Sequence, residues 1–448
     1  MADQAGGFRL PNRHSERASG ARQVSASRVA LVIGALALGT CASDGSRHSP
    51  GEDSCDLPGG SASNPTDLGS VLSTSTSCTV FVLEDGYYEP TSIMRSGVTI
   101  RAANRCRALL RGELEIRGSN VVVDGVSVTT PETAISVYKP GVHVRNSCIQ
   151  GFGKSAYGNG IWIFQEALDE SNRIFIESNT LDDWGGFLYS GGIAIGKADD
   201  DRNSHSDVTV EVRRNRITGG PTTETIYNAA VQSFHPFIAY GNYVHTVNGT
   251  AFQNKTFNSY IACNEVVNNL GDGALYNRSS SNNVWEYNLI HDSYLGIDHF
   301  TGDGNVFRGN VIYDTDYIGR IKNHQPGSTN LLIESNTFYN TSASAGWIWD
   351  SSSDGSISNV VWRSNLFHTI HGEAIESPVP YAWDEYANGF YQTSRPSSTT
   401  GYATGSSVTL DPRLADLPAD FTVLEPAMMS MGAPWPLPCP EFNGERSG

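Results

Sequence analysis

Positively charged residues are in short supply in this 448-residue chain. Its 30 lysines and arginines stand against 47 aspartates and glutamates, which gives a net charge of −17 at pH 7. The first 42 residues hold five of the arginines and two of the acidic residues, so the remainder has 25 basic against 45 acidic residues, a net charge of −20. Such a surface repels nucleic acid and anionic lipid. It accepts a polyanionic ligand only where basic side chains gather locally.

Several common functional motifs are missing as well. The sequence has no Cys-x-x-Cys pair, which argues against a zinc site. Nothing in it resembles a Walker loop, a dinucleotide-binding fingerprint or a Ser-His-Asp triad. Nucleotide-dependent enzymes and triad hydrolases are therefore not expected.

Helix formers are scarce, and long amphipathic helices are not evident. What the chain has instead is 46 glycines, with Asn, Ser and Thr recurring between short apolar runs. This composition is typical of many short strands joined by tight turns. We therefore expect an all-β protein.

The N-terminus carries an export pattern. An arginine-rich start precedes an apolar run, VALVIGALALG at residues 29–39, which is too short to span a bilayer. This order predicts a secretory signal over residues 1–42, followed by a polar linker over 43–54. Leu38-Gly39-Thr40-Cys41 resembles a bacterial lipobox except for its threonine, so a lipid on Cys41 and ordinary cleavage after Ala42 are both open. The mature protein is expected to be secreted, or held by that lipid at the outer cell surface or in the periplasm.

Six cysteines follow the signal, and an even number in an exported chain permits disulfides. We expect Cys55 to pair with Cys78 in an N-terminal cap, and the other pairings stay open. The six are Cys55, Cys78, Cys106, Cys148, Cys263 and Cys439.

A repeated phrase organises the chain: a strand, a turn with asparagine, a second strand, then a glycine and a third strand. The turn asparagines recur in steps of 33, 36, 27, 22, 24, 22, 26 and 29 residues. Such a repeat predicts a single-domain parallel β-helix over residues 55–378, closed by an irregular C-terminal segment over 379–448 that packs on it. Stacked asparagines can satisfy buried backbone groups along such a solenoid. The marker residues are Asn146, Asn179, Asn215, Asn242, Asn264, Asn288, Asn310, Asn336 and Asn365.

Three N-terminal segments and a C-terminal one carry a family resemblance. They are LEDGYY at residues 83–88, SGVTIRAA at 96–103, SNVVVDGV at 119–126, and DPR at 411–413 with GAP at 432–434. Residues 55–434 resemble the right-handed parallel β-helices of the pectin-lyase-like superfamily, and the opening coils look like those of secreted polysaccharide lyases. The resemblance implies the fold and leaves the reaction open.

In each coil of such a solenoid, the strand after the glycine lies at the same angle around the axis. Outward residues from several coils therefore line up on one face. Stacked strands lie about 4.8 Å apart, and four coils span about 15 Å, the length of about three sugar residues. We therefore expect this protein to bind a polysaccharide. We also expect it to be a monomer. Aromatic side chains could stack on sugar rings or fill the core; the candidates are Trp162, Tyr276, Phe300, Trp347 and Trp349. The charged and imidazole candidates are Lys255, Arg278, Asp298, His299, Arg320, Lys322 and His324.

Lys255 and Arg278 lie one repeat apart, which is similar to the lysine base and arginine acid of the alginate lyase and chondroitinase B family. The resemblance implies β-elimination, in which Lys255 takes the C5 proton of a uronate and Arg278 protonates the leaving oxygen. A neighbouring arginine should lower the pKa of Lys255. That family carries acidic calcium ligands just before the lysine, whereas Asn248 and Thr250 stand here. Calcium is the one cofactor that the resemblance implies, and its ligands stay open.

The remaining candidates are assigned to substrate binding. Arg320, Lys322 and His324 occupy alternate positions and would hold a uronate carboxylate, with the other candidates, Tyr276, Asp298 and His299, nearby. Two alternatives stay open. One is a glycoside hydrolase with a carboxylate pair such as Asp298 and Asp316, and the other is a non-catalytic β-helix that binds glycans.

Overall fold

The computed structural model describes residues 54–154, 158–168, 172–185, 190–196, 209–220, 228–322, 327–342, 345–350, 357–376, 383–393, 403–405 and 407–439. They all belong to one compact unit, Gly51–Gly448. The predicted signal and all of the linker except Ser54 lie outside the described residues. Within the described ranges, no helix is both long and apolar enough to cross a membrane.

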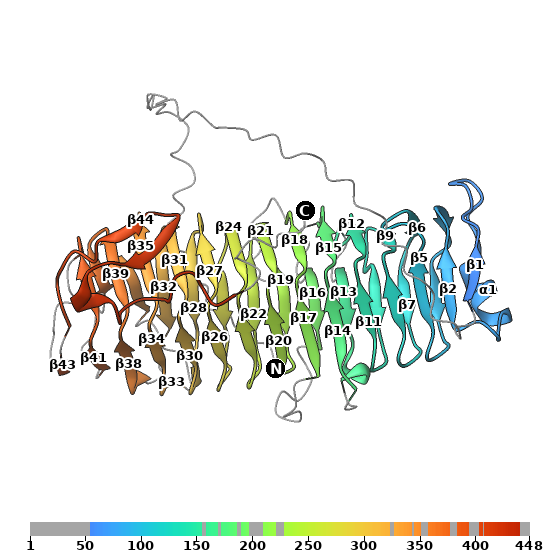
Figure 1. Cartoon of the computed structure of the whole chain (residues 1–448). Helices are drawn as coiled ribbons and strands as arrows, with labels where there is room; N and C mark the ends of the chain where they lie inside the picture. The colour runs from blue at the N-terminus through green and yellow to red at the C-terminus, as the bar shows by residue number, and fades with distance from the viewer. Residues whose placement is uncertain are drawn as a thin grey trace, which may run out of the picture. The chain divides into compact units, whose positions relative to one another are not determined.

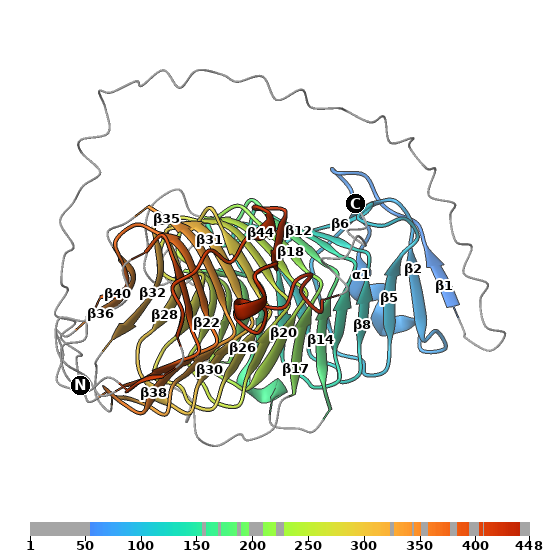
Figure 2. The same cartoon turned by 60° about the vertical axis from the view of Figure 1, so that its left-hand side comes forward.

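Three long parallel sheets make up the protein, and each coil contributes one strand to each sheet in turn (Figure 1). Figure 2 shows the same coils one behind another after a turn of the view. The arrangement confirms the predicted right-handed parallel β-helix and its all-β class.

The first sheet has 15 strands and opens each coil. In spatial order these strands are β1 (Ser54–Leu57), β2 (Val80–Leu83), β5 (Thr99–Ala102), β8 (Val122–Asp124), β11 (His143–Arg145), β14 (Ile174–Glu177), β17 (Val210–Arg213), β20 (Phe237–Tyr240), β23 (Tyr260–Ala262), β26 (Val284–Glu286), β30 (Val306–Arg308), β34 (Leu332–Glu334), β38 (Val360–Arg363), β41 (Trp383–Tyr386) and β43 (Ala403–Gly405).

The second sheet has 13 strands and follows the asparagine turn. Its strands are β3 (Gly86–Tyr88), β6 (Ala108–Arg111), β9 (Ser127–Thr129), β12 (Cys148–Gln150), β15 (Thr180–Asp182), β18 (Arg216–Thr218), β21 (Tyr243–Val247), β24 (Glu265–Asn269), β27 (Leu289–His291), β31 (Val311–Thr315), β35 (Thr337–Thr341), β39 (Leu366–Ile370) and β42 (Gly389–Tyr391).

The third sheet has 12 strands and carries the candidate site. Its strands are β4 (Thr91–Ile93), β7 (Leu114–Ile116), β10 (Ile135–Val137), β13 (Asn159–Ile163), β16 (Gly191–Ile195), β19 (Ala229–Ser233), β22 (Thr250–Asn254), β25 (Leu275–Asn277), β28 (Leu295–His299), β32 (Tyr317–Lys322), β36 (Ala345–Asp350) and β40 (Glu373–Glu376).

Smaller elements complete the fold. Helix α1 (Leu68–Thr74) lies at the N-terminal end and is capped by the side chain of Asp67. Among the described residues, two 3-10 turns occur at Gln165–Ala167 and Pro426–Met428. The remaining strands form a three-stranded sheet, β29 (Gly302–Asp303), β33 (Ser328–Thr329) and β37 (Ile357–Ser358), and an antiparallel pair, β44 (Leu414–Asp416) and β45 (Asp420–Val423).

A ladder of buried asparagines runs through the turn between the first and second sheets. At each step one Oδ1 accepts both the backbone N–H and the side-chain N–H of the asparagine one coil before, as Asn288 does from Asn264 at 3.1 and 3.0 Å. The side-chain amide also donates to a main-chain carbonyl, so groups that water cannot reach are satisfied. The members are Asn179, Asn215, Asn242, Asn264, Asn288, Asn310, Asn336, Asn365 and Asn388.

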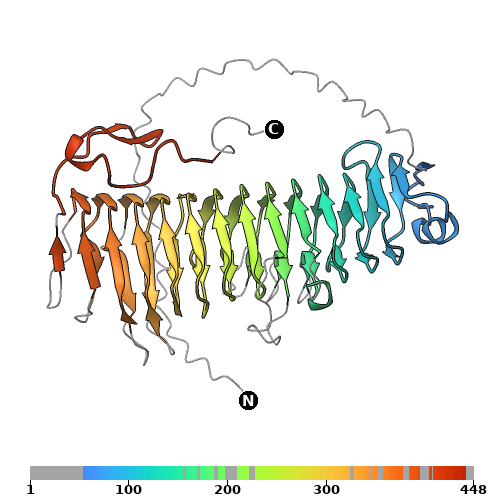
Figure 3. The ribbon, with the colours of Figure 1, turned by 60° about the horizontal axis from the view of Figure 1, so that its bottom comes forward.

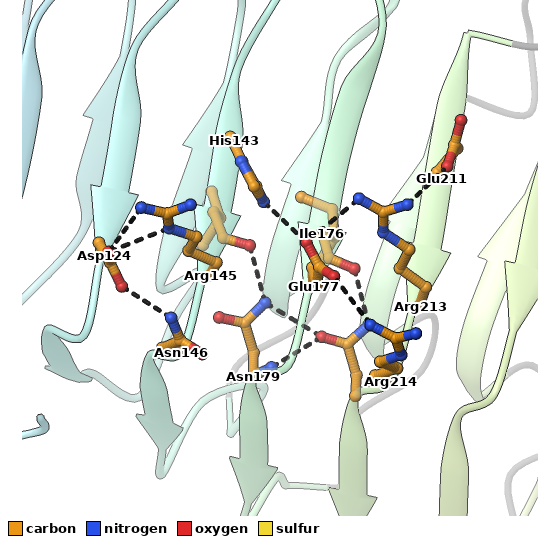
Figure 4. Close-up of polar contacts among 12 residues, drawn as sticks. Asp124, His143, Arg145, Asn146, Ile176, Glu177, Asn179, Glu211, Arg213 and Arg214 are labelled. Atoms are coloured by element: carbon orange, nitrogen blue, oxygen red, sulfur yellow. Dashed lines mark hydrogen bonds and ion pairs between the residues drawn. The ribbon is translucent and has the colours of Figure 1, made fainter. Parts of the chain in front are cut away.

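The ladder differs from the predicted series at both ends. Ser147, not Asn146, occupies the first place, and its backbone N–H donates to Asn179 at 3.0 Å. Asn146 lies one residue earlier in the left-handed region at φ 52° and donates to Asp124 (Figure 4). At the other end Asn388 continues the ladder, and β41, β42 and β43 still pair with the coils before them. The β-helix therefore extends to Gly405, so the boundary expected at residue 378 falls too early.

The outer face of the first sheet carries ion pairs between successive coils. Arg145 contacts Asp124 at 2.9 Å, and Arg213 contacts Glu177 at 3.2 Å (Figure 4). Two further Arg–Glu pairs follow, Arg308–Glu286 and Arg363–Glu334. These pairs are partly exposed and contribute little each, but the alternation of sign favours the observed register.

Three disulfides link described residues. Cys55 pairs with Cys78 as predicted, and the two pairings left open are Cys106–Cys148 and Cys263–Cys439. The last one ties the C-terminal segment, shown in red in Figure 3, to the coils. Phe421 of that segment packs on Tyr313, with ring centroids 5.3 Å apart, so the segment covers part of the second sheet.

We predict that Asn310→Ala lowers the free energy of unfolding by about 2–4 kcal/mol, because it leaves the N–H groups of Asn288 buried without an acceptor. Asn64→Ala is the control, since Asn64 is exposed and lies outside the ladder. Urea denaturation measures both. Equal losses in the two variants would show that the ladder does not stabilise the fold.

Candidate functional site

The candidate site lies on the outer face of the third sheet, where strands β19, β22, β25, β28 and β32 run side by side (Figure 1). Side chains alternate along a strand, so two outward rows cross these five coils. The first row is Gln232, Gln253, Tyr276, Asp298 and Arg320, which pair directly in register. The second row lies two residues further along each strand and is Phe234, Lys255, Arg278, Phe300 and Lys322.

Lys255 and Arg278 are neighbours in the second row, on consecutive coils. Their strands β22 and β25 pair from Phe252↔Leu275 to Asn254↔Asn277, which puts Lys255 and Arg278 at the same height. Parallel strands lie about 4.8 Å apart. The Lys255 side chain is 8% exposed, and its Nζ lies 4.6 Å from the ring centroid of Phe234. The structure thus places the two residues on one face, as the resemblance required, while their catalytic roles stay a prediction.

Arg320 and Lys322 converge on Asp298 from the next coil. Arg320 holds the carboxylate with two nitrogens, Nε at 3.2 Å and Nη2 at 2.5 Å, and Lys322 Nζ lies 3.4 Å away. Burial alone would raise the pKa of Asp298, but the two cations outweigh it and hold that pKa below its usual value. Asp298 is completely buried. It therefore positions Arg320 and Lys322 rather than contacting a ligand itself.

Tyr276 lies between the two candidate pairs. Its ring meets Phe300 edge to face, with centroids 6.5 Å apart, and Lys322 Nζ lies 4.9 Å from the centroid of Phe300. Burial, followed by the charge of Asp298, raises the pKa of Tyr276, so its hydroxyl stays protonated at neutral pH. The guanidinium of Arg278 lies 5.4 Å from the Phe300 ring. These aromatic contacts keep the cations on the sheet.

His299 does not belong to this face. It follows Asp298 on the same strand and so points into the coil, where it is fully buried and its Nδ1 lies 3.1 Å from Asn277 Nδ2. Burial lowers the pKa of His299 to about 4, and within the described ranges its Nε2 has no hydrogen-bond partner. The structure therefore does not support the predicted role of His299 in binding substrate. His324 lies outside the described residues.

The aromatic candidates divide between core and surface. Trp347 is fully buried among core side chains and cannot stack on a sugar. Trp162 and Phe300 are partly exposed on the outer face. Trp349 belongs to β36, and its side chain lies outside what the structure describes.

The carboxylate pair needed for hydrolysis is not formed by Asp298 and Asp316. Asp316 lies before β32, four residues ahead of the Arg320 that pairs with Asp298, and this separation is about 13 Å along a strand. Hydrolysis requires a spacing of about 5 to 10 Å. Asp298 is also buried in an ion pair, whereas Asp316 accepts a hydrogen bond from Ser342 at the surface. This face does not favour a glycosidase.

Side chains near Lys255 do not fit a calcium site built from carboxylates. The register neighbours of Lys255 are Phe234 and Arg278. The nearest residues of the first row are amides, of which Gln232 Nε2 donates to Gln253 Oε1 at 2.6 Å. Among the described residues no group of three or more His, Cys, Asp or Glu could hold a metal ion. Calcium prefers six to eight oxygen ligands that include carboxylates. Sequence reasoning overlooked Gln232, Gln253 and Phe234, although each stands at the repeat position of a residue that it did select.

No protein-family model matches the sequence, and no curated protein sequence does either. Solved structures do match. The PL6 family alginate lyase AlyGC aligns with a TM-score of 0.58 and 15% identity, over 86% of this chain and 57% of its own. A PL6 alginate lyase in complex with a trisaccharide aligns with a TM-score of 0.55 and 15% identity, over 86% of this chain and 96% of its own. A mannuronic acid specific family 6 lyase from human gut microbiota aligns with a TM-score of 0.53 and 12% identity, over 80% of this chain and 91% of its own.

These likenesses establish the fold. The chain is a right-handed parallel β-helix of the kind found in polysaccharide lyases, and the resemblance noted in the sequence is confirmed at that level. The three solved neighbours named above are all family 6 lyases, two of them described as alginate lyases. The chain spans little more than half the length of AlyGC.

We predict that Asp298→Asn destabilises the protein by about 3–5 kcal/mol, because two partly buried cations lose the buried carboxylate that they share. The pKa of Asp298 is lowered by folding, so its contribution is present above the unfolded pKa of about 3.9 and is lost as the pH falls below it. The variant should therefore lose less stability on acidification than the wild type. Urea midpoints between neutral pH and pH of about 3 measure this, with Asp316→Asn as the exposed control. A steeper acid loss in Asp298→Asn would contradict the ion-pair assignment.

Proposed function

We propose that this protein is a polysaccharide lyase that cleaves a uronate-containing glycan by β-elimination. The observation that carries the proposal is the in-register placement of Lys255 and Arg278 on consecutive coils, beside Arg320 and Lys322 on the same outer face. The fold shared with structurally characterised alginate lyases supports it.

Local charge also supports a uronate ligand. The candidate face combines four cations, Lys255, Arg278, Arg320 and Lys322, with two carboxylates, those of Asp298 and Asp272, and Asp272 Oδ1 lies 3.7 Å from Arg320 Nη2. These six side chains sum to +2 in a chain whose net charge is −17. A polyanion would therefore be attracted to this face and repelled elsewhere.

In the proposed reaction Lys255 Nζ, in its neutral form, takes the proton from C5 of the uronate. The electron pair of that C–H bond forms the C4–C5 double bond, the C4–O4 bond breaks, and the departing oxygen takes a proton from the guanidinium of Arg278, which water then restores. Arg278, one coil from Lys255, is the cation nearest to the carboxylate of that uronate and makes the C5 proton more acidic. Arg320 and Lys322, three coil steps or about 14 Å from Lys255, bind the carboxylate of another uronate of the same glycan. Asp298 keeps those two cations in place.

The proposal extends to location and cofactor. The export pattern over residues 1–42 supports action outside the cytoplasm, either as a free monomer or anchored through a lipid on Cys41. Protein cations take the part that calcium would play in neutralising the carboxylate.

We predict that wild-type protein incubated with alginate, pectate or chondroitin sulfate raises the ultraviolet absorbance that belongs to an unsaturated uronate. Lys255→Ala should lower this rate by about 10²–10⁴-fold, the usual contribution of a general base. Lys154→Ala, an exposed lysine paired with Asp183 on another coil, is the control. If Lys255→Ala keeps full activity, Lys255 is not the base. New reducing ends without absorbance would favour hydrolysis, and glycan retention without either signal would favour a binding protein.

We predict that the elimination rate survives exhaustive treatment with EDTA, because the cations that neutralise the carboxylate belong to the protein. The measurement compares the treated enzyme with and without added Ca²⁺. A loss that Ca²⁺ restores would show that a metal site exists and that the cationic side chains do not suffice.

A further inference from the structure

Three aromatic rings form a stack on the outer face of the third sheet, several coils before Lys255. Phe164 stacks on Tyr138 with ring centroids 4.3 Å apart and planes 13° apart. It also stacks on Trp162, at 4.3 Å and 21°. All three side chains are partly exposed, whereas the aromatic residues of the core are fully buried. We call Tyr138, Trp162 and Phe164 the aromatic stack.

Neighbouring groups hold the aromatic stack in place without surrounding it with cations. The Trp162 indole N–H donates to the carbonyl of Gly196 at 3.4 Å, which fixes the plane of that ring. The guanidinium of Arg117 lies 4.1 Å from the centroid of Tyr138. Arg117 is paired in turn with Glu115 at 2.9 Å, and Glu113 accepts a hydrogen bond from Ser136, so no excess of cations gathers there. The stack therefore differs from the basic face around Lys255 in what it can recognise.

The aromatic stack and the basic face share the same two outward rows. Trp162 pairs with Ala194, Ala194 with Gln232, and Gln232 with Gln253. In the parallel row Phe164 is followed by Gly196, Phe234 and Lys255 on successive coils. The coil of β16 therefore contributes only Ala194 and, just after the strand, Gly196 to these rows, so no large side chain of the two rows stands between Trp162 and the coil of Phe234.

We propose that the aromatic stack is a distal glycan subsite, which binds a pyranose ring of the same polysaccharide chain whose reacting uronate lies at Lys255. The inference rests on the proposed function for the identity of the chain. Three coil steps separate β13 from β22, a distance of about 14 Å, or about three sugar residues. Recognition here uses the apolar face of a sugar ring against an aromatic plane and needs no carboxylate contact.

The two outward rows run without a break from the basic face to the aromatic stack, which favours the same glycan chain as the ligand of the stack. A glycan that follows the cations from Lys322 towards Lys255 meets Phe234 next, then the small side chains of β16, and then Trp162. A trisaccharide placed across Lys255 and Arg278 ends before the stack, whereas an octasaccharide covers both. The subsite should therefore favour long chains over short ones.

The test measures chain-length dependence. Trp162→Ala should raise the KM for polymeric alginate and for an alginate octasaccharide by roughly 10-fold, with kcat and the kinetics on a trisaccharide unchanged. Trp162→Phe, which keeps a flat ring, should restore most of the affinity. Phe175→Ala is the matched control, because Phe175 is a partly exposed aromatic residue of the next strand, β14, in the first sheet. Equal KM changes on the trisaccharide and the octasaccharide would overturn the subsite.

A binding measurement separates this inference from the proposed reaction. Affinity electrophoresis in gels that contain alginate compares wild type, Trp162→Ala and Tyr138→Ala without any need for turnover. Wild-type retention that both variants weaken supports the subsite even if no elimination is ever seen. Retention that is the same in all three proteins, or no retention of the wild type, overturns it. Circular dichroism spectra that match the wild type show that the variants are folded.

Discussion

The vertical register between coils is the constraint on which the rest of the structure depends. Every strand of the three long sheets pairs in parallel with the strand one coil away, and the asparagine ladder fixes that pairing from inside. An asparagine that moved by one residue would leave two donors buried without an acceptor, at a cost of about 1–3 kcal/mol each. The ladder thus sets the height of each coil, and outward side chains from distant parts of the sequence line up because of it. A site made from Lys255, Arg278, Arg320 and Lys322 exists only under this condition.

Charge is distributed differently on the outer faces of two of the sheets. On the first sheet arginines and carboxylates alternate from coil to coil, as in Asp124–Arg145 and Glu286–Arg308, so the charges cancel. On the third sheet the charged residues named above leave an excess of cations around a buried Asp298. An acidic protein that keeps a local positive face has a means of directing a polyanion to one place. The neutral aromatic stack further along the same rows would then supply affinity without charge.

Much of this could be predicted from the sequence, and the limits have physical reasons. The asparagine spacing gave the fold because buried hydrogen bonds permit little drift in that turn. The glycine used to align the third strand is a weaker marker. In the parallel pairing, Gly296 lies opposite Ala274 and not opposite Gly273, and Gly319 lies opposite Ile297 and not opposite Gly296. These glycines therefore shift by one residue along the strand from each coil to the next. Lys255 and Arg278 still meet because Lys255 follows Gly249 by six residues and Arg278 follows Gly273 by five, which offsets the drift of one residue.

Other features were not predicted because side chains alternate along a strand, or because the residues involved are far apart in the sequence. Asp298 and His299 are adjacent on one strand and cannot both face outward, which the sequence analysis did not use. Neither the ion pair between Asp298 and Arg320 nor the disulfide between Cys263 and Cys439 could be predicted, because each joins segments whose relative height depends on loop lengths. Asn388 was overlooked because its repeat lacks the apolar triplets of the earlier coils.

The most direct test of the account is a crystal structure of Lys255→Ala with a uronate octasaccharide bound. The account predicts that C5 of one uronate faces position 255, that the carboxylate of another uronate of the same oligosaccharide contacts Arg320 and Lys322, and that the oligosaccharide follows the outer face of the third sheet. An oligosaccharide bound to another sheet, or on this face with its carboxylates turned away from Arg320 and Lys322, would contradict it.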